Sequence, residues 1–195
     1  MKKWLIPLIV IGALIFLLGG WYVRTNNSFV EMKGQATKQW ANVESSYQRR
    51  NDLIGNLVET VKGAADFERG TLTEVIEARA KATQIQVNPE NAQQLAEFQQ
   101  AQTGLSSALS RLLVTVERYP ELKANQNFLE LQSQLEGTEN RINVERNRFN
   151  DIAGDYNIAI AKIPGNIIAG MANFDEMPLF QADAGAEKAY KVDFN

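Results

Sequence analysis

The sequence predicts an all-α protein, in which an N-terminal transmembrane helix is followed by an antiparallel up-and-down bundle of three to four long helices. Only 13 Gly and 5 Pro occur in 195 residues, and so few helix-breaking residues favour long helices over many short strands. One early segment is apolar over the thickness of a bilayer. Three later runs place apolar residues at the alternating spacings of three and four that indicate helices with one buried stripe.

Residues 4–23 form the predicted transmembrane helix, because this stretch contains no charged side chain. At about 1.5 Å per residue it is about 30 Å long, which matches the hydrocarbon core of a membrane. Trp4, Trp21 and Tyr22 lie at its ends, where amphipathic aromatic side chains favour the headgroup level. A cleaved signal peptide would have a shorter apolar region and a small-x-small cleavage site. We therefore expect an uncleaved span behind a short flank of residues 1–3.

The charges around the span predict its orientation. Lys2, Lys3 and the amino terminus precede the span, whereas Arg24 follows it. Basic residues favour the cytoplasmic side, so the bundle is expected to be extracytoplasmic. The lipid bilayer is thus the first expected partner. A nucleic-acid partner is not expected, because the net charge is −3 and no basic stripe is present.

The first helical run follows a polar break at Asn26-Asn27-Ser28, where Ser28 can cap the helix, and is expected to end near Gln86. Its pattern is a heptad seam, as in coiled coils. Two charged residues, Arg50 and Glu68, interrupt this seam. The seam positions are Ala36, Trp40, Val43, Tyr47, Arg50, Ile54, Leu57, Val61, Ala64, Glu68, Leu72 and Val75.

The first run is much longer than the second, so it can bend or break. Gly55, Gly63 and Gly70 are the candidate positions. The pattern Thr71-x-x-Glu74 is a capping box that would restart a helix after a break. Whether the bundle has three or four helices stays open.

Two further runs complete the bundle domain, which is expected to span residues 28–163. The triplet Asn88-Pro89-Glu90 is a helix start for the run that Pro120 ends, and Pro164 ends the third run. Residues 164–195 carry many apolar side chains without a period, which is too apolar for a free linker. This tail is expected to dock on the bundle, on a neighbouring molecule or on the membrane surface.

Several motifs of this chain resemble those of the LemA family of bacterial membrane proteins, and they follow one another in the same order. They are Arg49-Arg50-x-Asp52-Leu53-Ile54-x-Asn56-Leu57-Val58, Val61-Lys62-Gly63, Tyr119-Pro120-x-Leu122-Lys123-Ala124-Asn125, Leu135-Glu136-x-Thr138-Glu139-Asn140-Arg141-Ile142 and Tyr156-Asn157. Gly55 stands where the family usually has Pro, and Ile163 where it usually has Phe. The resemblance implies a single N-terminal span in the bacterial inner (cell) membrane, an antiparallel helical bundle and no established activity.

Ten polar residues are predicted to form a structural network that fixes helix register. They are Arg49, Arg50, Asp52, Asn56, Glu68, Glu136, Glu139, Asn140, Arg141 and Glu145. Helical spacing places Arg49, Asp52 and Asn56 on one face. Arg50 lies instead on the apolar seam, where a buried cation without a partner costs several kcal/mol, roughly. Its predicted partners are Glu145 or Glu68, because they are the other charged residues in seam register.

The chain contains neither His nor Cys, which removes the usual acid–base, thiol and zinc chemistry. No catalytic residue, cofactor or metal site is predicted. The predicted function is a non-enzymatic, membrane-anchored scaffold or interaction protein, which self-assembles through its heptad seams or binds another membrane protein. The alternative is a carboxylate-only metal-dependent enzyme or binder, since Glu136, Glu139 and Glu145 could provide oxygen ligands to a hard cation.

Overall fold

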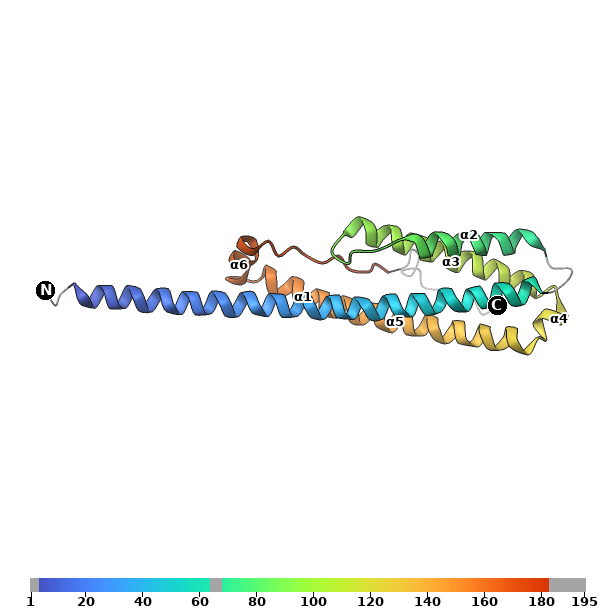
Figure 1. The fold of residues 1–195 in the computed structure, drawn as a ribbon, viewed down its shortest axis with the longest axis horizontal. Helices are drawn as coiled ribbons and strands as arrows, with labels where there is room; N and C mark the ends of the chain where they lie inside the picture. Colours follow the sequence, from blue (N-terminus) through green and yellow to red (C-terminus); the bar gives the residue numbers. More distant parts are fainter. Residues whose placement is uncertain (1–3, 64–67, 183–195) are drawn as a thin grey trace, which may run out of the picture.

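The computed structural model describes residues 4–63 and 68–182. Within these ranges the chain forms helices and no strand, which confirms the predicted fold class (Figure 1). The helices are α1 (Leu5–Lys62), α2 (Arg69–Gln84), α3 (Ala92–Val116), α4 (Pro120–Lys123), α5 (Gln126–Ala161) and α6 (Gly165–Ala172).

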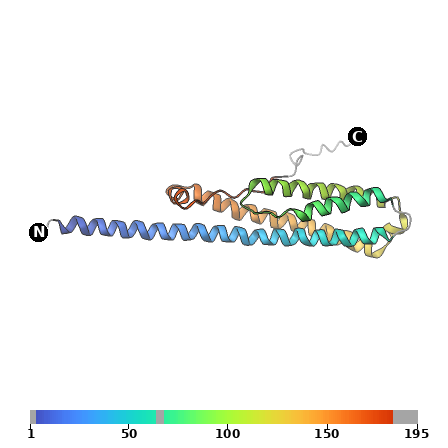
Figure 2. The same cartoon turned by 45° about the horizontal axis from the view of Figure 1, so that its top comes forward.

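Helices α1, α2, α3 and α5 lie side by side and alternate in direction, which makes the predicted up-and-down bundle (Figures 1 and 2). The backbone of α1 packs mainly on that of α5, and the backbone of α2 mainly on that of α3. The short helix α4 closes the far end of the bundle. Helix α6 lies at the opposite end, where it contacts both α1 and α5. The first part of α1 extends beyond the bundle on that side.

Helix α1 is continuous from Leu5 to Lys62, so the predicted break at Asn26-Asn27-Ser28 is wrong and Ser28 caps no helix. Asn and Ser cost only a few tenths of a kcal/mol, roughly, inside a helix, whereas a new helix would require a new nucleus. The apolar residues 5–23 are exposed throughout. This helix is long and apolar enough to cross a membrane. The candidate span and the first bundle helix are therefore one rod.

The first run breaks at Gly63, not at Gly55 or Gly70. Helix α1 ends at Lys62, and the backbone N–H of Gly63 donates to the Glu59 carbonyl oxygen at 3.2 Å. The predicted capping box does not start α2, because its N-cap is Glu68. The first run, for which the sequence allowed one helix or two, therefore contributes two helices to the bundle, α1 and α2.

The start of α3 also differs from the predicted one. Its N-cap is Asn91, whose side-chain oxygen accepts from the backbone N–H groups of Gln93 and Gln94 at 3.0 and 3.1 Å. Asn88 instead closes a turn just before it, because its side-chain oxygen accepts from the backbone N–H of Glu90. Asn88 and Asn91 are both suitable N-cap residues, and the sequence pattern predicted the earlier of the two.

Gly55 allows a side chain of α2 to cross the surface of α1. A Cβ atom at Gly55 would lie 3.0 Å from Nη2 of Arg79. The same Arg79 side chain donates from Nε to the backbone oxygen of Asn51 at 2.8 Å. Gly55 thus makes room for a contact between α1 and α2.

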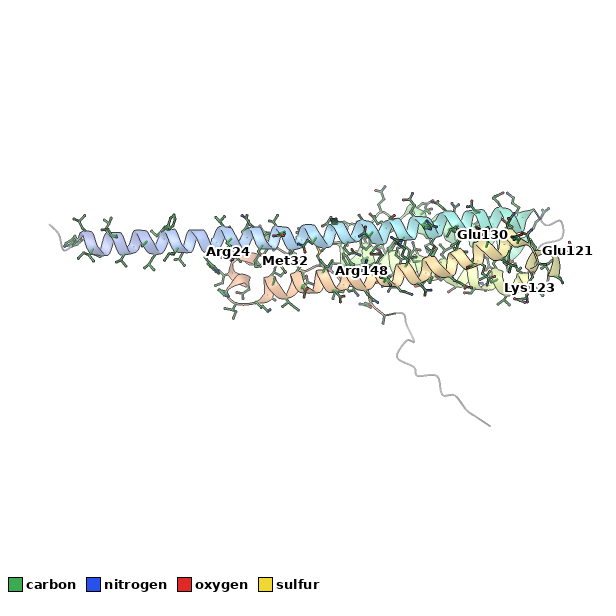
Figure 3. All side chains as sticks on the ribbon, turned by 90° about the horizontal axis from the view of Figure 1, so that it is seen from below. Arg24, Met32, Glu121, Lys123, Glu130 and Arg148 are labelled. Atoms are coloured by element: carbon green, nitrogen blue, oxygen red, sulfur yellow. The ribbon has the colours of Figure 1, made fainter. Side chains whose placement is uncertain are left out.

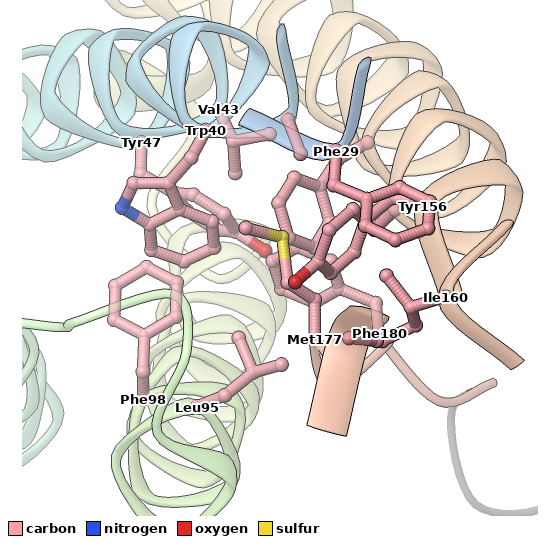
Figure 4. Close-up of a cluster of buried hydrophobic side chains, with 14 of the residues drawn as sticks. Phe29, Trp40, Val43, Tyr47, Leu95, Phe98, Tyr156, Ile160, Met177 and Phe180 are labelled. Atoms are coloured by element: carbon pink, nitrogen blue, oxygen red, sulfur yellow. The ribbon is translucent and has the colours of Figure 1, made fainter. Parts of the chain in front are cut away.

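Aromatic rings fill the half of the core that is nearer to the N-terminus (Figure 4). Trp40 of α1 lies at its centre. Its ring meets Phe98 of α3 at 5.9 Å and Phe149 of α5 at 5.5 Å, both edge to face. Phe180, which follows α6, stacks on the same indole at 5.6 Å. One side chain therefore ties three helices and the C-terminal segment together.

Aliphatic side chains fill the other half of the core. Ile54 and Leu57 of α1 pack there with Leu105 and Leu112 of α3, all without exposed surface. The seam positions of α1 from Ala36 to Val61 are buried, as predicted.

Removal of residues 1–24 should leave a soluble and highly helical domain. The removed apolar residues are exposed, and Phe29 is the first buried residue of the described chain. Circular dichroism and size-exclusion chromatography of the truncated protein would measure the helix content and solubility. An insoluble product, or a spectrum dominated by strand, would contradict the architecture.

Candidate functional site

An extended segment after α6, which we call the strap (residues 174–182), lies along α5. Its main chain is held by the side chains of four α5 residues. Asn157 donates from Nδ2 to the Met177 oxygen and accepts from the Met177 N–H, both at 2.8 Å. Asn150 makes the same pair of bonds with Phe180, both at 2.9 Å. The two asparagines are one heptad apart on α5. Each side chain supplies the hydrogen-bond donor and acceptor that a neighbouring strand would otherwise provide to the extended main chain.

The hydroxyl of Tyr156 provides a third attachment, because it donates to the backbone oxygen of Asp175 at 3.0 Å. Burial raises the pKa of the Tyr156 phenol, and the charges of Glu90 and Asp175 raise it further. The hydroxyl therefore stays protonated and remains a donor at neutral pH.

The end of the strap lies between α3 and α5. The backbone oxygen of Gln181 accepts from Arg146 of α5 at 2.9 Å and from Gln99 of α3 at 3.3 Å. The guanidinium of Arg146 also covers the Phe180 ring, 4.9 Å from its centre. The docking on the bundle that the sequence allowed for the tail thus applies to residues 174–182. The remainder of the predicted tail, residues 183–195, lies outside the described residues.

A groove continues beyond the strap between α3 and α5, with α1 as its floor. We call it the α3/α5 groove. It consists of two adjoining hollows of about 240 and 390 Å³, which share Arg50, Ser106, Ser110 and Glu139. The hollow nearer to the strap is polar, whereas Ile54, Leu109, Leu113 and Leu135 line the farther one.

Arg50 lies on the floor of the α3/α5 groove and is 4% exposed. Its Nη1 donates to Oε2 of Glu139 at 2.8 Å, and its Nη2 donates to Oε1 of Gln102. Nη1 also lies 3.4 Å from the Ser106 hydroxyl, and the guanidinium carbon is 5.1 Å from the centre of the Tyr47 ring. The buried cation therefore has a carboxylate, an amide and an aromatic face as partners.

The predicted partners of Arg50 are wrong: it pairs with Glu139, and neither Glu145 nor Glu68 contacts it. Glu145 is buried and accepts from Nε2 of Gln39 at 2.7 Å. Glu68 is exposed and pairs with Arg118 at 2.9 Å. Seam register does not specify which turns of two antiparallel helices lie opposite each other. The break at Gly63 in addition removes Glu68 from the seam of α1.

The other predicted site residues do not join one network. Arg49, Asp52, Asn56 and Asn140 have exposed side chains. Glu136 is exposed as well and accepts from Nε2 of Gln132 at 3.3 Å. Arg141 lies 3.9 Å from Glu145, near enough for a weak surface ion pair. The structure joins two separate pairs of the ten residues, Arg50 with Glu139 and Arg141 with Glu145.

Two nitrogens of residues that line the polar hollow have no hydrogen-bond partner among the described residues. They are Nε of Arg50 and Nε2 of Gln102. A buried donor without an acceptor costs about 1–3 kcal/mol. Both atoms are covered by protein atoms and not open to the hollow, so they destabilise the interior and are not donors to a bound chain.

The three acidic residues proposed for the metal alternative do not converge. Glu136, Glu139 and Glu145 each have a different partner, as described above. No group of three or more acidic side chains that could hold a metal ion occurs within residues 4–63 and 68–182. The geometry gives the metal alternative no support.

The residues that hold the strap were not found from the sequence. Asn150, Asn157 and Gln99 lie on helices but bond to an extended segment that is remote in sequence. The sequence contained no signal specific to them, because α5 contains six asparagines and other pairs of these are also one heptad apart.

Comparison with known proteins gives one family and several relatives. A model of the LemA family matches residues 39–194. Two magnetosome proteins of Paramagnetospirillum magneticum, MamQ 1 and MamQ 2, are each 26% identical over 174 residues, which is 80% of this chain and 64% of theirs. The protein LemA of Metamycoplasma hominis is 22% identical over 175 residues, which is 90% of this chain and 75% of that protein. The chain thus spans slightly less than two thirds of the MamQ proteins.

Replacement of Arg50 by Ala should lower the free energy of unfolding by about 3 kcal/mol, because it leaves a cavity and an amide without its partner. Urea denaturation followed by circular dichroism would measure the change. Arg49→Ala is the matched control, since this neighbouring side chain is exposed and should not alter stability. Equal effects of the two substitutions would show that Arg50 is solvated.

Replacement of Asn150 by Ala should release the end of the strap. The main-chain N–H and oxygen of Phe180 would lose their partners, and local opening should become easier by about 1–3 kcal/mol. Hydrogen exchange at the Phe180 amide would report this opening directly. Asn147→Ala, an exposed position on the same helix, should leave that exchange rate unchanged. Unaltered exchange in Asn150→Ala would mean that other contacts alone hold the strap.

Proposed function

This chain belongs to the LemA family, and on that premise we propose that it is a non-catalytic scaffold, anchored in the membrane by residues 4–23, that binds an extended segment of another protein. The proposed binding surface is the open part of the α3/α5 groove. The observation that carries the proposal is the strap, because an extended chain already occupies the same groove by bonds from side chains to main chain.

The way in which the strap is held supports recognition of a chain by the groove. Asn150 and Asn157 bond to both the N–H and the oxygen of a residue in the strap. Recognition of the main chain gives affinity for an extended peptide, and pockets for its side chains give specificity. The strap ends at residue 182, and the groove continues beyond it with polar and apolar walls.

The open part of the groove favours a segment with an acceptor near the strap and an apolar side chain farther away. The partly exposed Ser106 lines the polar hollow, and its hydroxyl can donate to a carbonyl oxygen of a bound chain. Leu109, Leu113 and Leu135 provide an apolar surface in the farther hollow. Burial of one large apolar side chain there contributes about 1.5–3 kcal/mol.

The heptad seams are not the proposed binding surface. Seam residues such as Val43, Leu57, Leu105 and Ile142 are buried inside this single chain, so they are not available to a second copy. We propose the α3/α5 groove in their place. The experiment below would identify a second copy of the chain if that copy provided the bound segment.

The relatives support a location at a membrane. The names of the MamQ proteins assign them to the magnetosome, and they carry a region similar to most of this chain. Their own partners are not carried over, because this chain spans slightly less than two thirds of their length. The bundle is proposed to be extracytoplasmic, on the basis of Lys2 and Lys3 before the span.

A photo-crosslinking residue at Ser106 of the full-length protein tests the proposal in native membranes. The same residue at Glu77, exposed on α2, is the matched control. We expect a discrete product at Ser106 and none at Glu77, with the attachment mapped by mass spectrometry to one segment of another protein.

A synthetic peptide of the mapped segment should then bind the purified protein. Ser106→Trp, which fills the groove, should weaken its binding at least about tenfold, a loss of about 1.4 kcal/mol, without lowering the melting temperature. The proposal fails if Ser106 links only to residues 183–195 of its own chain, if it links to nothing, or if Ser106→Trp binds the peptide as well as the unaltered protein.

A further inference from the structure

We infer that α6 is a membrane-surface helix, which inserts its exposed apolar face into the headgroup region of the bilayer that α1 crosses. This inference rests on the proposed membrane anchoring by residues 4–23. It does not depend on the α3/α5 groove.

Helix α6 buries one face and exposes another that is equally apolar. Ile168 and Ala169 pack into the core and are 1% and 5% exposed. Ile167 and Met171 are 60% and 70% exposed, and the step of four residues between them places them in a short apolar row on one face of α6. Ile163, in the turn directly before the helix, is 83% exposed. Single exposed apolar residues are ordinary, but several large ones close together indicate a contact surface.

The position of α6 along α1 matches the headgroup region. Gly165, at the start of α6, lies against Phe29 of α1, because a Cβ atom at Gly165 would be 3.1 Å from that ring. Phe29 follows Val23, the last residue of the apolar segment, by about 9 Å of helix rise. The headgroup layer occupies about 5–8 Å on each side of the hydrocarbon core. The start of α6 therefore lies at the outer edge of the headgroup layer, within reach of it for the side chains of the helix.

The orientation of α6 suits a surface helix. In Figure 2 the view runs nearly along the axis of α6 while α1 crosses the picture, so α6 lies crosswise to α1. Because transmembrane helices are tilted by only about 20° on average, α6 would lie close to the membrane plane. Amphipathic helices in this orientation bury their apolar face about 5–10 Å into the boundary between headgroups and acyl chains.

Basic side chains accompany the apolar row. Lys162 is exposed directly before Ile163. Arg24, also exposed, follows the apolar segment of α1, and Figure 3 shows it near the end of the bundle at which α6 lies. Cations at this level are attracted to anionic headgroups, and their long stems can lie along apolar surface. A lipid surface matches both the apolar row and these charges.

The chain contains no Cys, so a single introduced Cys gives one labelled position. Full-length Ile167→Cys, labelled with the environment-sensitive dye NBD, is reconstituted into vesicles of equal parts phosphatidylcholine and phosphatidylglycerol. Thr73→Cys on α2, which is exposed and remote from α6, is the matched control. Leu14→Cys, within the apolar segment, reports the anchor itself.

We expect the label at residue 167 to be quenched strongly by lipids with a nitroxide near the headgroup, and several-fold less than the label at residue 73 by iodide in the water. Equal iodide quenching at 167 and 73, with the label at residue 14 shielded in the bilayer, would overturn the inference and leave the anchor intact. Shielding at 167 without quenching by the nitroxide lipids would show that a second copy covers α6, which also overturns it. A label at residue 14 that iodide reaches would refute the anchor, and α6 with it.

Discussion

Helix α1 carries the apolar segment and the buried seam of the bundle on one hydrogen-bonded rod, and the position of every other element depends on it. Residues such as Val43, Ile54 and Val61 line the core on the same helix whose first part is exposed and apolar. A flexible joint between the two parts would let the bundle rotate freely. A continuous helix instead fixes which end and which face of the bundle approach the membrane.

The α3/α5 groove results from how the other helices pack around this rod. The backbone contacts pair α1 with α5 and α2 with α3, and α3 and α5 do not meet closely. Small side chains such as Ser106 and Ser110 face the space between them and leave it partly open. The strap fills one half of that space with Met177 and Phe180, both buried. Arg50 crosses the floor of the other half, where Glu139 neutralises its charge.

The sequence predicted the fold class, the candidate span and the seam because they depend on periodicities within a single helix. It predicted wrongly the break at residues 26–28, since the modest cost of Asn and Ser in a helix does not outweigh a new nucleus. The partner of Arg50 depends on how far α5 is shifted along α1, which no period specifies. Asn150 and Asn157 could not be recognised as the attachment of the strap, because their partners lie 20 or more residues away and follow no repeat.

The strap connects the two surfaces for which roles are proposed. It follows α6, and near its end side chains of α3 and α5 both donate to the backbone oxygen of Gln181. Its main chain is attached to α5 at several points, so the strap is fixed to the bundle along its length. Phe180 of the strap stacks on Trp40 at the centre of the aromatic core. One extended segment thus leads from α6 through the aromatic core to the beginning of the open groove.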